Sequence, residues 1–266
     1  MIYDEIVGQL GIRSGEKLWI SSDITKYVLW SRKNKEEFSP ARLIEVLRES
    51  VGSEGTLLFP VFSFEFSNHG RYDYKNTKGT SGHLGNLALS TEGFRRTSHP
   101  MHSFAVWGRD RDLLCAMENL HSFGEDSPFG YCRTENVRQL MLGTDHKHAM
   151  TYVHYVETVC RVPYRFAKTF RGIYVTEDGK EEEREYLYAA RRLDVGTKEC
   201  FNRMGDILEQ AGIGYAKEIR GIENHSVLLG SSHEPMCDDI LHNMCRNLYD
   251  FEVSREELFK GYGEGS

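Results

Sequence analysis

Three runs of sequence decide the fold: KLWIS (residues 17–21), SPARLIEVLRESVG (residues 39–52) and GTLLFPVFSF (residues 55–64). The first and third runs are short and apolar, as buried strands are, whereas the middle run has apolar residues at helical spacing. Ser39 is a candidate N-cap, and Pro40 suits the first turn of a helix. A strand, a helix and a second strand in this order predict a crossover between parallel strands.

The rest of the chain predicts further strands and helices around this crossover. Helical spacing of apolar residues covers residues 2–11, 198–212 and 236–251, and core strands are expected in FAVWG (104–108) and RQLMLG (138–143). Residues 63–90, rich in Gly, Asn, Ser and Thr, predict an irregular excursion, and residues 172–188 predict a hairpin that turns at Asp178 and Gly179. We therefore expect one α/β domain over residues 1–266, with a mixed sheet flanked by helices and a small C-terminal lobe or hairpin closing the site.

Composition narrows the classes of function. The 266 residues are 39% hydrophobic, so the chain can bury a substantial core, and its net charge is -7. That charge gives no broad reason to bind nucleic acid or a membrane, and suits a cationic substrate better. The N-terminus lacks a signal-peptide pattern, and the six cysteines show no CxxC pair or framework spacing. We expect a cytoplasmic protein with free thiols.

The stretch TYVHYVETVC (residues 151–160) places a hydroxyl, an imidazole and a carboxylate three residues apart. At helical spacing Thr151, His154 and Glu157 share one face, so they would converge on whatever that face meets. The pattern indicates either a buried polar network or a catalytic group.

Four motifs in sequence order carry a resemblance to a known family: GSEGTLLFPVF, FRRTSHPMHSFAVWG, DSPFG and LMLGTDHKHAMTYVHYVE. Together with KLWISSD they resemble the aminoglycoside 3-N-acetyltransferase family, which is distinct in fold from the GNAT acetyltransferases. The resemblance covers roughly the first 160 residues, with a looser match in residues 201–213. It implies a mixed α/β fold and an enzyme that transfers acetyl from acetyl-CoA to an amine, without a metal.

The resemblance also implies roles for the 151–160 stretch. An amine that attacks a thioester must be neutral, and a histidine with an ordinary pKa near ~6.5 can accept its proton. We expect His154 to be the general base and Glu157, or another carboxylate, to orient its ring. Thr151 would donate its hydroxyl to the thioester carbonyl or to the departing sulfur.

The other family motifs imply contacts with acetyl-CoA. The residues expected to bind it are Ser21, Ser22, Arg96, Thr97, His99, Ser103, Ser127 and Pro128. Arg96, Thr97 and Ser103 would act as loop donors, with Pro100 stiffening the approach, although a simple strand-entry turn would have the same sequence. In place of a Gly-rich loop this chain has WSRKNKEEFSP (residues 30–40), whose basic residues Arg32, Lys33 and Lys35 either approach the nucleotide phosphates or form a solvated loop.

The expected partner is a small-molecule amine: an aminoglycoside or a related amino sugar. Asp126, Asp145 and Asp194 are candidate contacts for its positive charge, and the sequence does not choose among them. A homo-oligomer is compatible with the sequence.

Two other classes of function compete. His146, His148, His154 and Glu157 can be interpreted as HxH followed by HxxE, which would suit a metal-dependent hydrolase but matches no known signature. A catalytically idle CoA-binding module is the second alternative. Binding alone would not require a base at His154, which argues against that module.

Overall fold

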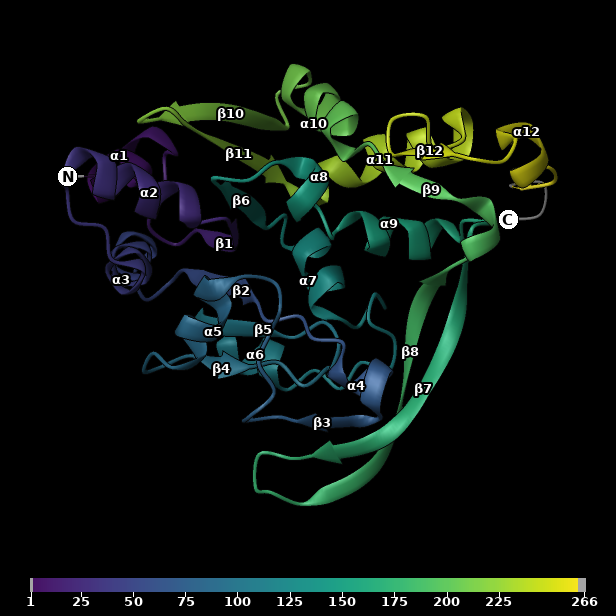
Figure 1. The fold of residues 1–266 in the computed structure, drawn as a ribbon, viewed down its shortest axis with the longest axis horizontal. Helices are drawn as coiled ribbons and strands as arrows, with labels where there is room; N and C mark the ends of the chain where they lie inside the picture. Colours follow the sequence, from purple (N-terminus) through teal and green to yellow (C-terminus); the bar gives the residue numbers. More distant parts are fainter. Residues whose placement is uncertain (1, 263–266) are drawn as a thin grey trace.

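A seven-stranded mixed sheet forms the centre of the protein (Figure 1). The computed structural model describes residues 2–262. The strands of this sheet are β1 (Lys17–Ser22), β2 (Thr56–Pro60), β4 (Arg95–Arg96), β5 (Phe104–Gly108), β6 (Arg138–Leu142), β10 (Gly214–Ile219) and β11 (Ile222–Leu228). They lie in the order β10-β11-β6-β1-β2-β5-β4. Strand β1 pairs in parallel with β2 and β6, and the other neighbouring pairs are antiparallel, which confirms the expected mixed sheet.

Helices cover both faces of the sheet. Because successive strand residues point to opposite faces, Leu18 and Ile20 enter one apolar cluster and Trp19 enters the other. The Leu18 side packs against α1 (Ile2–Gln9), α2 (Thr25–Asn34), α3 (Pro40–Val51) and α5 (His83–Leu89). The Trp19 side packs against α6 (Arg111–Cys115), α7 (Pro128–Thr134), α8 (His146–Ala149), α9 (Val153–Cys160), α10 (Phe201–Gln210) and α11 (Leu229–Asn243). The α/β class with flanking helices is thus confirmed.

The crossover from β1 to β2 forms as the sequence predicts. The Ser39 Oγ accepts a hydrogen bond from the Arg42 N–H at 3.3 Å, and Pro40 opens α3. This cap satisfies one of the free donors at the start of the helix. The apolar side of α3, which includes Leu43 and Leu47, is fully buried against the sheet.

Helix α2, between β1 and α3, is absent from the sequence prediction. Among its ten residues only Tyr27 and Ser31 are buried, so the apolar spacing that identifies a helix is missing. Its last turn carries Arg32 and Lys33, and Lys35 ends it in the left-handed conformation at φ 55°. All three basic side chains are exposed.

The predicted hairpin is longer than expected. Strands β7 (Arg165–Val175) and β8 (Glu181–Arg191) pair along their whole length, and Gly179 in the turn has φ 86°. Strand β3 (Arg71–Asp73) adds to β7 in parallel, which makes a separate three-stranded sheet. In Figure 1 this hairpin curves along one side and under the lower part of the molecule. Its first residue, Arg165, lies at the candidate active site described below.

Two predicted segments differ in the structure. Residues 63–90 contain α4 (Glu65–His69), β3 and α5, so the excursion is more regular than expected. The helix expected over 236–251 ends at Asn243, because Met244 and Cys245 take left-handed backbone conformations with φ 51° and 59°. The chain then forms β12 (Tyr249–Phe251), which pairs with β9 (Thr197–Glu199), and the short helices η1 (Leu193–Val195) and α12 (Arg255–Leu258) complete the C-terminal part.

No helix within residues 2–262 combines the length and the apolar character needed to cross a bilayer.

Candidate active site

His154 and Glu157 lie on α9, one turn apart, as the sequence predicts. The Nδ1 atom of His154 lies 2.8 Å from the Oε2 of Glu157. The side chain of Glu157 is fully buried, whereas that of His154 keeps 21% of its surface exposed. A carboxylate can only accept hydrogen bonds, so we assign the ring proton to Nδ1. The Nε2 lone pair is then free to accept a proton.

Arg165 and Tyr164 complete the surroundings of Glu157, and neither was expected. The Arg165 Nε lies 2.6 Å from the Glu157 Oε2, and the Tyr164 hydroxyl donates to Oε1 at 2.9 Å. The Arg165 Nη2 also lies 3.0 Å from the His154 Nδ1. Because a guanidinium can only donate, this approach is a close contact and not a hydrogen bond once Nδ1 carries the proton. Arg165 opens β7, and only the folded chain brings it to α9, so no local sequence pattern could identify it.

These contacts set the protonation states of the pair. Burial lowers the pKa of His154, and the charge of Arg165 lowers it further, although Glu157 acts in the opposite direction. Burial alone would raise the pKa of Glu157, but Arg165 and His154 outweigh it and hold that pKa at about 2. At neutral pH the site therefore contains a neutral imidazole held by a carboxylate, which is the state that a general base requires.

Thr151 lies outside the helix that carries His154. Helix α9 begins at Val153, and Thr151 belongs to the turn between α8 and α9, where its carbonyl accepts a hydrogen bond from the His154 N–H at 3.0 Å. Thr151 instead lines a pocket of about 390 Å³. His154 does not line this pocket. Thr151 is the lining residue that is nearest to His154 and Glu157 in the sequence.

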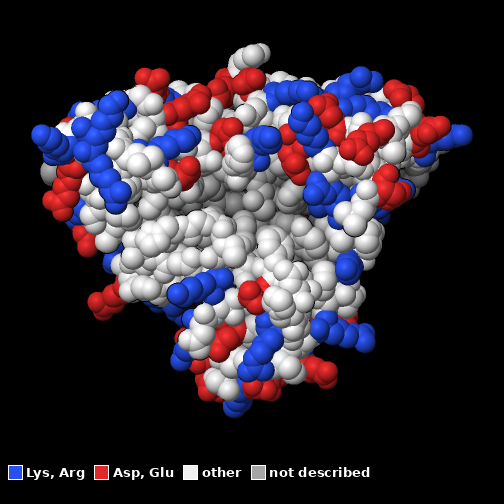
Figure 2. Space-filling model, in the orientation of Figure 1, with Lys and Arg blue, Asp and Glu red and all other residues white. Residues whose placement is uncertain are grey.

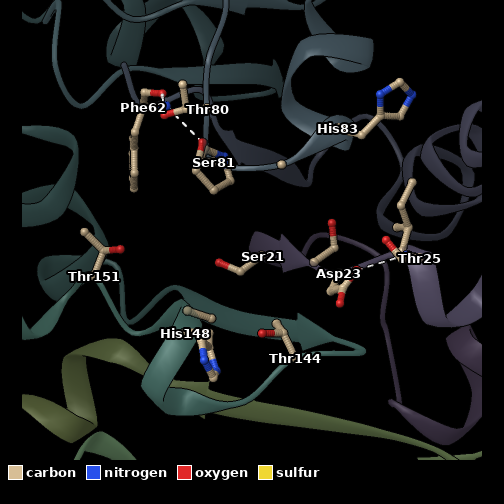
Figure 3. Close-up of a pocket in the computed structure, with 15 residues that line it drawn as sticks. Ser21, Asp23, Thr25, Phe62, Thr80, Ser81, His83, Thr144, His148 and Thr151 are labelled. Atoms are coloured by element: carbon tan, nitrogen blue, oxygen red, sulfur yellow. Dashed lines mark hydrogen bonds between the residues drawn. The ribbon is translucent and has the colours of Figure 1, made fainter. Parts of the chain in front are cut away.

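The pocket lies at the ends of β1 and β6 (Figure 3). Its wall is rich in hydroxyl groups and comes from four parts of the chain. The lining residues are Ser21, Ser22, Asp23, Ile24, Thr25, Pro60, Phe62, Thr80, Ser81, Gly82, His83, Thr144, His148, Ala149 and Thr151. In Figure 3 the hydroxyls of Ser21 and Thr151 point toward one another across the pocket. Ser21 and Ser22 therefore line a pocket, and their expected contact with acetyl-CoA stays a prediction.

Gln139 holds two sides of this pocket together, although no sequence pattern identifies it. Its Nε2 donates to the Ser21 Oγ at 3.0 Å and to the Ala149 carbonyl at 2.8 Å. The side chain is fully buried in β6. It thus fixes the end of β1 relative to the α8 segment.

The predicted donors of the RRTSHPMHS motif are buried away from the pocket wall. The Arg96 Nε donates to the Ser103 Oγ at 2.9 Å, and its Nη2 donates to the Val61 carbonyl at 3.2 Å. The Thr97 Oγ1 accepts from the Phe104 N–H at 2.9 Å, and the His99 Nδ1 accepts from two backbone N–H groups at 3.3 Å. These groups hold the loop that enters β5. Their expected contact with acetyl-CoA stays a prediction that this geometry does not support.

Ser127 and Pro128 form the start of α7, and their expected contact with acetyl-CoA stays a prediction. The Ser127 Oγ accepts from the Phe129 N–H at 3.2 Å, and Pro128 occupies the first turn. Both side chains are buried, and neither lines the pocket near Ser21. The turn that the sequence predicts is present as a helix cap.

The basic and acidic candidates are spread over the surface. Arg32 and Lys33 lie at the end of α2 opposite to Thr25, which lines the pocket. Asp194 is exposed and pairs with Arg192 at 2.6 Å. Asp145 accepts from the His148 N–H at 3.1 Å as the cap of α8.

Of the three acidic candidates, Asp145 is therefore the one flanked by pocket residues, since Thr144 and His148 both line the wall. Asp126 precedes α7 and does not line that pocket. The charges on the face shown in Figure 2 are mixed, and its hollowed centre is mostly uncharged.

The four residues of the hydrolase alternative do not form one group. The His148 Nδ1 lies 2.5 Å from the Asp145 Oδ1, while the His154 Nδ1 lies 2.8 Å from Glu157. Within residues 2–262, no set of potential metal ligands combines His154 with His146 or His148.

Comparison with known proteins gives a family match and distant relatives. The sequence profile described as aminoglycoside 3-N-acetyltransferase matches residues 30–233. An SPbeta prophage-derived aminoglycoside N(3')-acetyltransferase-like protein, YokD of Bacillus subtilis (strain 168), is 24% identical over 223 residues, which cover 75% of this chain and 76% of that protein. Aminoglycoside N(3)-acetyltransferase IV of Salmonella sp is 27% identical over 192 residues, covering 69% of this chain and 67% of that enzyme.

Solved structures share the fold. Aminoglycoside acetyltransferase AAC(3)-Xa superimposes with a TM-score of 0.74 at 17% identity, covering 90% of this chain and 91% of that one. The binary complex of AAC-IIIb with CoASH gives 0.74 at 18% identity, with 91% and 95% covered. AAC-VIa bound to sisomicin gives 0.71 at 16% identity, with 90% and 95% covered. At these low sequence identities, the likeness to the solved structures shows a shared fold and nothing further.

Proposed function

Because this chain belongs to the aminoglycoside 3-N-acetyltransferase family, and is therefore an acyltransferase, we propose that it transfers acetyl from acetyl-CoA to an amine with His154 as general base. The observation that carries the proposal is the His154 ring, which is partly exposed and held at 2.8 Å by a buried carboxylate. When bound, acetyl-CoA supplies the thioester whose C–S bond breaks as the N–C bond to the acceptor forms.

His154 would remove the proton of the attacking amine through Nε2. Its Nδ1–H is held by Glu157, so proton uptake at Nε2 places the positive charge of the imidazolium beside a carboxylate. Arg165 keeps that carboxylate ionised and in place. General-base catalysis of this kind contributes roughly 10²–10⁴-fold to a rate.

The pocket at the ends of β1 and β6 suits the pantetheine arm of acetyl-CoA. Ser21, Ser22 and Thr151 provide hydroxyl groups that can donate to amide and thioester oxygens, and Phe62 and Ile24 add apolar surface. Thr151 is the lining residue closest in the chain to His154, so we place the thioester next to it. Its hydroxyl would stabilise the carbonyl oxygen as negative charge develops there.

We propose an aminoglycoside or a related amino sugar as the acceptor. Aminoglycoside-modifying relatives and the sisomicin complex of AAC-VIa, which has the same fold, support this class. Asp145 is the acidic candidate beside the pocket, where it could attract an ammonium group before deprotonation.

The decisive experiment is a CoA-release assay over a panel of aminoglycosides and nucleotide-linked amino sugars. We expect thiol release that depends on one of these amines and that His154→Ala reduces at least a hundredfold. Binding of acetyl-CoA without release on any amine of the panel would favour the idle module instead.

A further inference from the structure

Three side chains meet where α10 packs against the β10–β11 end of the sheet. This place lies outside the site described above. They are His146 at the start of α8, Glu209 in α10 and His225 in β11. One potential ligand atom from each lies within 4.8 Å of the other two. The His225 Nδ1 lies 2.8 Å from the Glu209 Oε1, and the rings of His146 and His225 are 4.7 Å apart.

His146 has a buried ring nitrogen without a hydrogen-bond partner in the described part of the chain. Its side chain is 2% exposed, and its Nε2 has no hydrogen-bond partner among the described residues. A buried polar nitrogen without a partner is costly, and native structures rarely contain one without a reason. A positive ion bound between the two rings and Glu209 would satisfy it.

Helix α10 is shaped to receive the His146 ring. A Cβ added at Gly205 would lie 2.3 Å from the His146 Nδ1, so this ring packs directly on the helix backbone. Glu209 follows Gly205 by four residues and thus lies on the same side of the helix. Ring and carboxylate are therefore placed together by one turn of α10.

We propose that His146, Glu209 and His225 form a zinc site. Two imidazole nitrogens and one carboxylate oxygen are the donors that Zn²⁺ prefers, whereas Mg²⁺ and Ca²⁺ select oxygen ligands. Three protein ligands leave a fourth tetrahedral position for water. Glu223, whose side chain is 68% exposed, lies 3.5 Å from the His225 Nε2 and marks the solvent side of the site.

The role of this zinc would be structural. His146 stands between Thr144 and His148, both of which line the pocket near Ser21. Zinc would tie this wall to α10 and β11, two elements that come late in the chain. The site thus acts on the shape of the pocket and not on the reacting atoms.

The test uses the full chain, freed of metal with a chelator and titrated with ZnCl₂ by calorimetry. We expect one Zn²⁺ per chain and a rise in Tm on zinc addition, because an ion that binds the native state stabilises it. Glu209→Gln and His225→Gln should each weaken zinc binding at least tenfold. His242→Gln, which changes an exposed histidine of α11, is the matched control and should bind zinc as the parent does.

The proposal is overturned by a parent protein that takes up no zinc at micromolar concentrations, or by a Glu209→Gln variant that binds zinc as tightly as the parent. Loss of binding in His242→Gln would mean that surface histidines account for the uptake. If the ligand variants fail to fold, the visible spectrum of the Co²⁺-loaded parent decides alone. Intense tetrahedral bands support the site, and the pale spectrum of a six-coordinate ion contradicts it.

Discussion

The Nδ1 of His154 lies 2.8 Å from the Oε2 of Glu157, and the same carboxylate oxygen lies 2.6 Å from the Nε of Arg165. One buried carboxylate therefore serves both the base and a neighbouring guanidinium. Changes to the base and changes to its support should consequently have different effects on activity and stability.

His154→Ala should lower kcat by roughly a hundredfold or more and leave the fold nearly intact. The substitution removes the base but leaves Glu157 paired with Arg165, so no buried charge loses its main partner. Steady-state CoA release and thermal unfolding of the same preparation check both parts. A stable His154→Ala protein that works at the parental rate would end the catalytic assignment.

Glu157→Gln should destabilise the protein by about 3–5 kcal/mol at neutral pH, because it leaves the buried charge of Arg165 without its counterion. The parental contribution also depends on pH. The pKa of Glu157 is about 2 in the folded protein, below its ordinary value of 4.5. Its stabilising effect is therefore complete above the ordinary value and is lost as the pH falls toward 2.

Denaturant unfolding between pH 7 and pH 3 measures this effect. The parent should lose stability toward the acidic end, and the difference from Glu157→Gln should shrink over that range. Glu185→Gln breaks a surface pair with Arg171 and is the control, with an expected change of about 0–1 kcal/mol. Equal losses in the two variants would contradict the buried ion pair.

Thr151→Val should slow turnover by roughly a hundredfold if its hydroxyl donates to the developing oxyanion, since loss of one such donor typically costs ~10²–10³. The acidic limb of the pH–rate profile should stay in place, because the base is unchanged. Thr158→Val is the matched control and should keep the parental kcat, because the Thr158 Oγ1 donates to the His154 carbonyl within α9. Parental kcat in Thr151→Val would exclude this role.

Acetyl-CoA should raise the Tm of the parent, because it binds only the folded state. Ser22→Leu places a large apolar group in the pocket wall and should reduce that shift at millimolar acetyl-CoA. Ser90→Leu, at the exposed end of α5, should retain it. The comparison is made by thermal scanning with and without ligand. An unchanged shift in Ser22→Leu would move the binding site away from this pocket.

The sequence predicted the parts of the fold that local patterns encode. Ser39, Pro40 and the apolar spacing after them identified α3, and the runs around Trp19 and Leu58 identified buried strands. Helix α2 was not predicted, because only Tyr27 and Ser31 of this helix are buried and the sequence therefore lacks apolar residues at helical spacing. The end of α11 was not predicted, because the residues that take the left-handed conformation there are Met244 and Cys245 and not glycine, the residue that usually marks such an end.

The site was predictable in part for the same reason. His154 and Glu157 lie one turn apart on one helix, so their spacing in the sequence is their spacing in space. Arg165 and Gln139 reach the site through strand pairing and packing, which no local pattern records. The RRTSHPMHS motif attracted a functional interpretation, yet Arg96 and His99 are buried within the protein.

The position of β6 in the sheet has a consequence for biosynthesis. This strand, all five of whose residues are buried, pairs with β1 on one edge and with β11 on the other. The chain reaches residue 142 long before it reaches residue 222, so on the ribosome β6 can join β1 while its second edge has no partner. An open apolar edge is a template for pairing with other chains. The last quarter of the polypeptide, which contains β11, thus closes an edge through which the first half could otherwise pair with other chains.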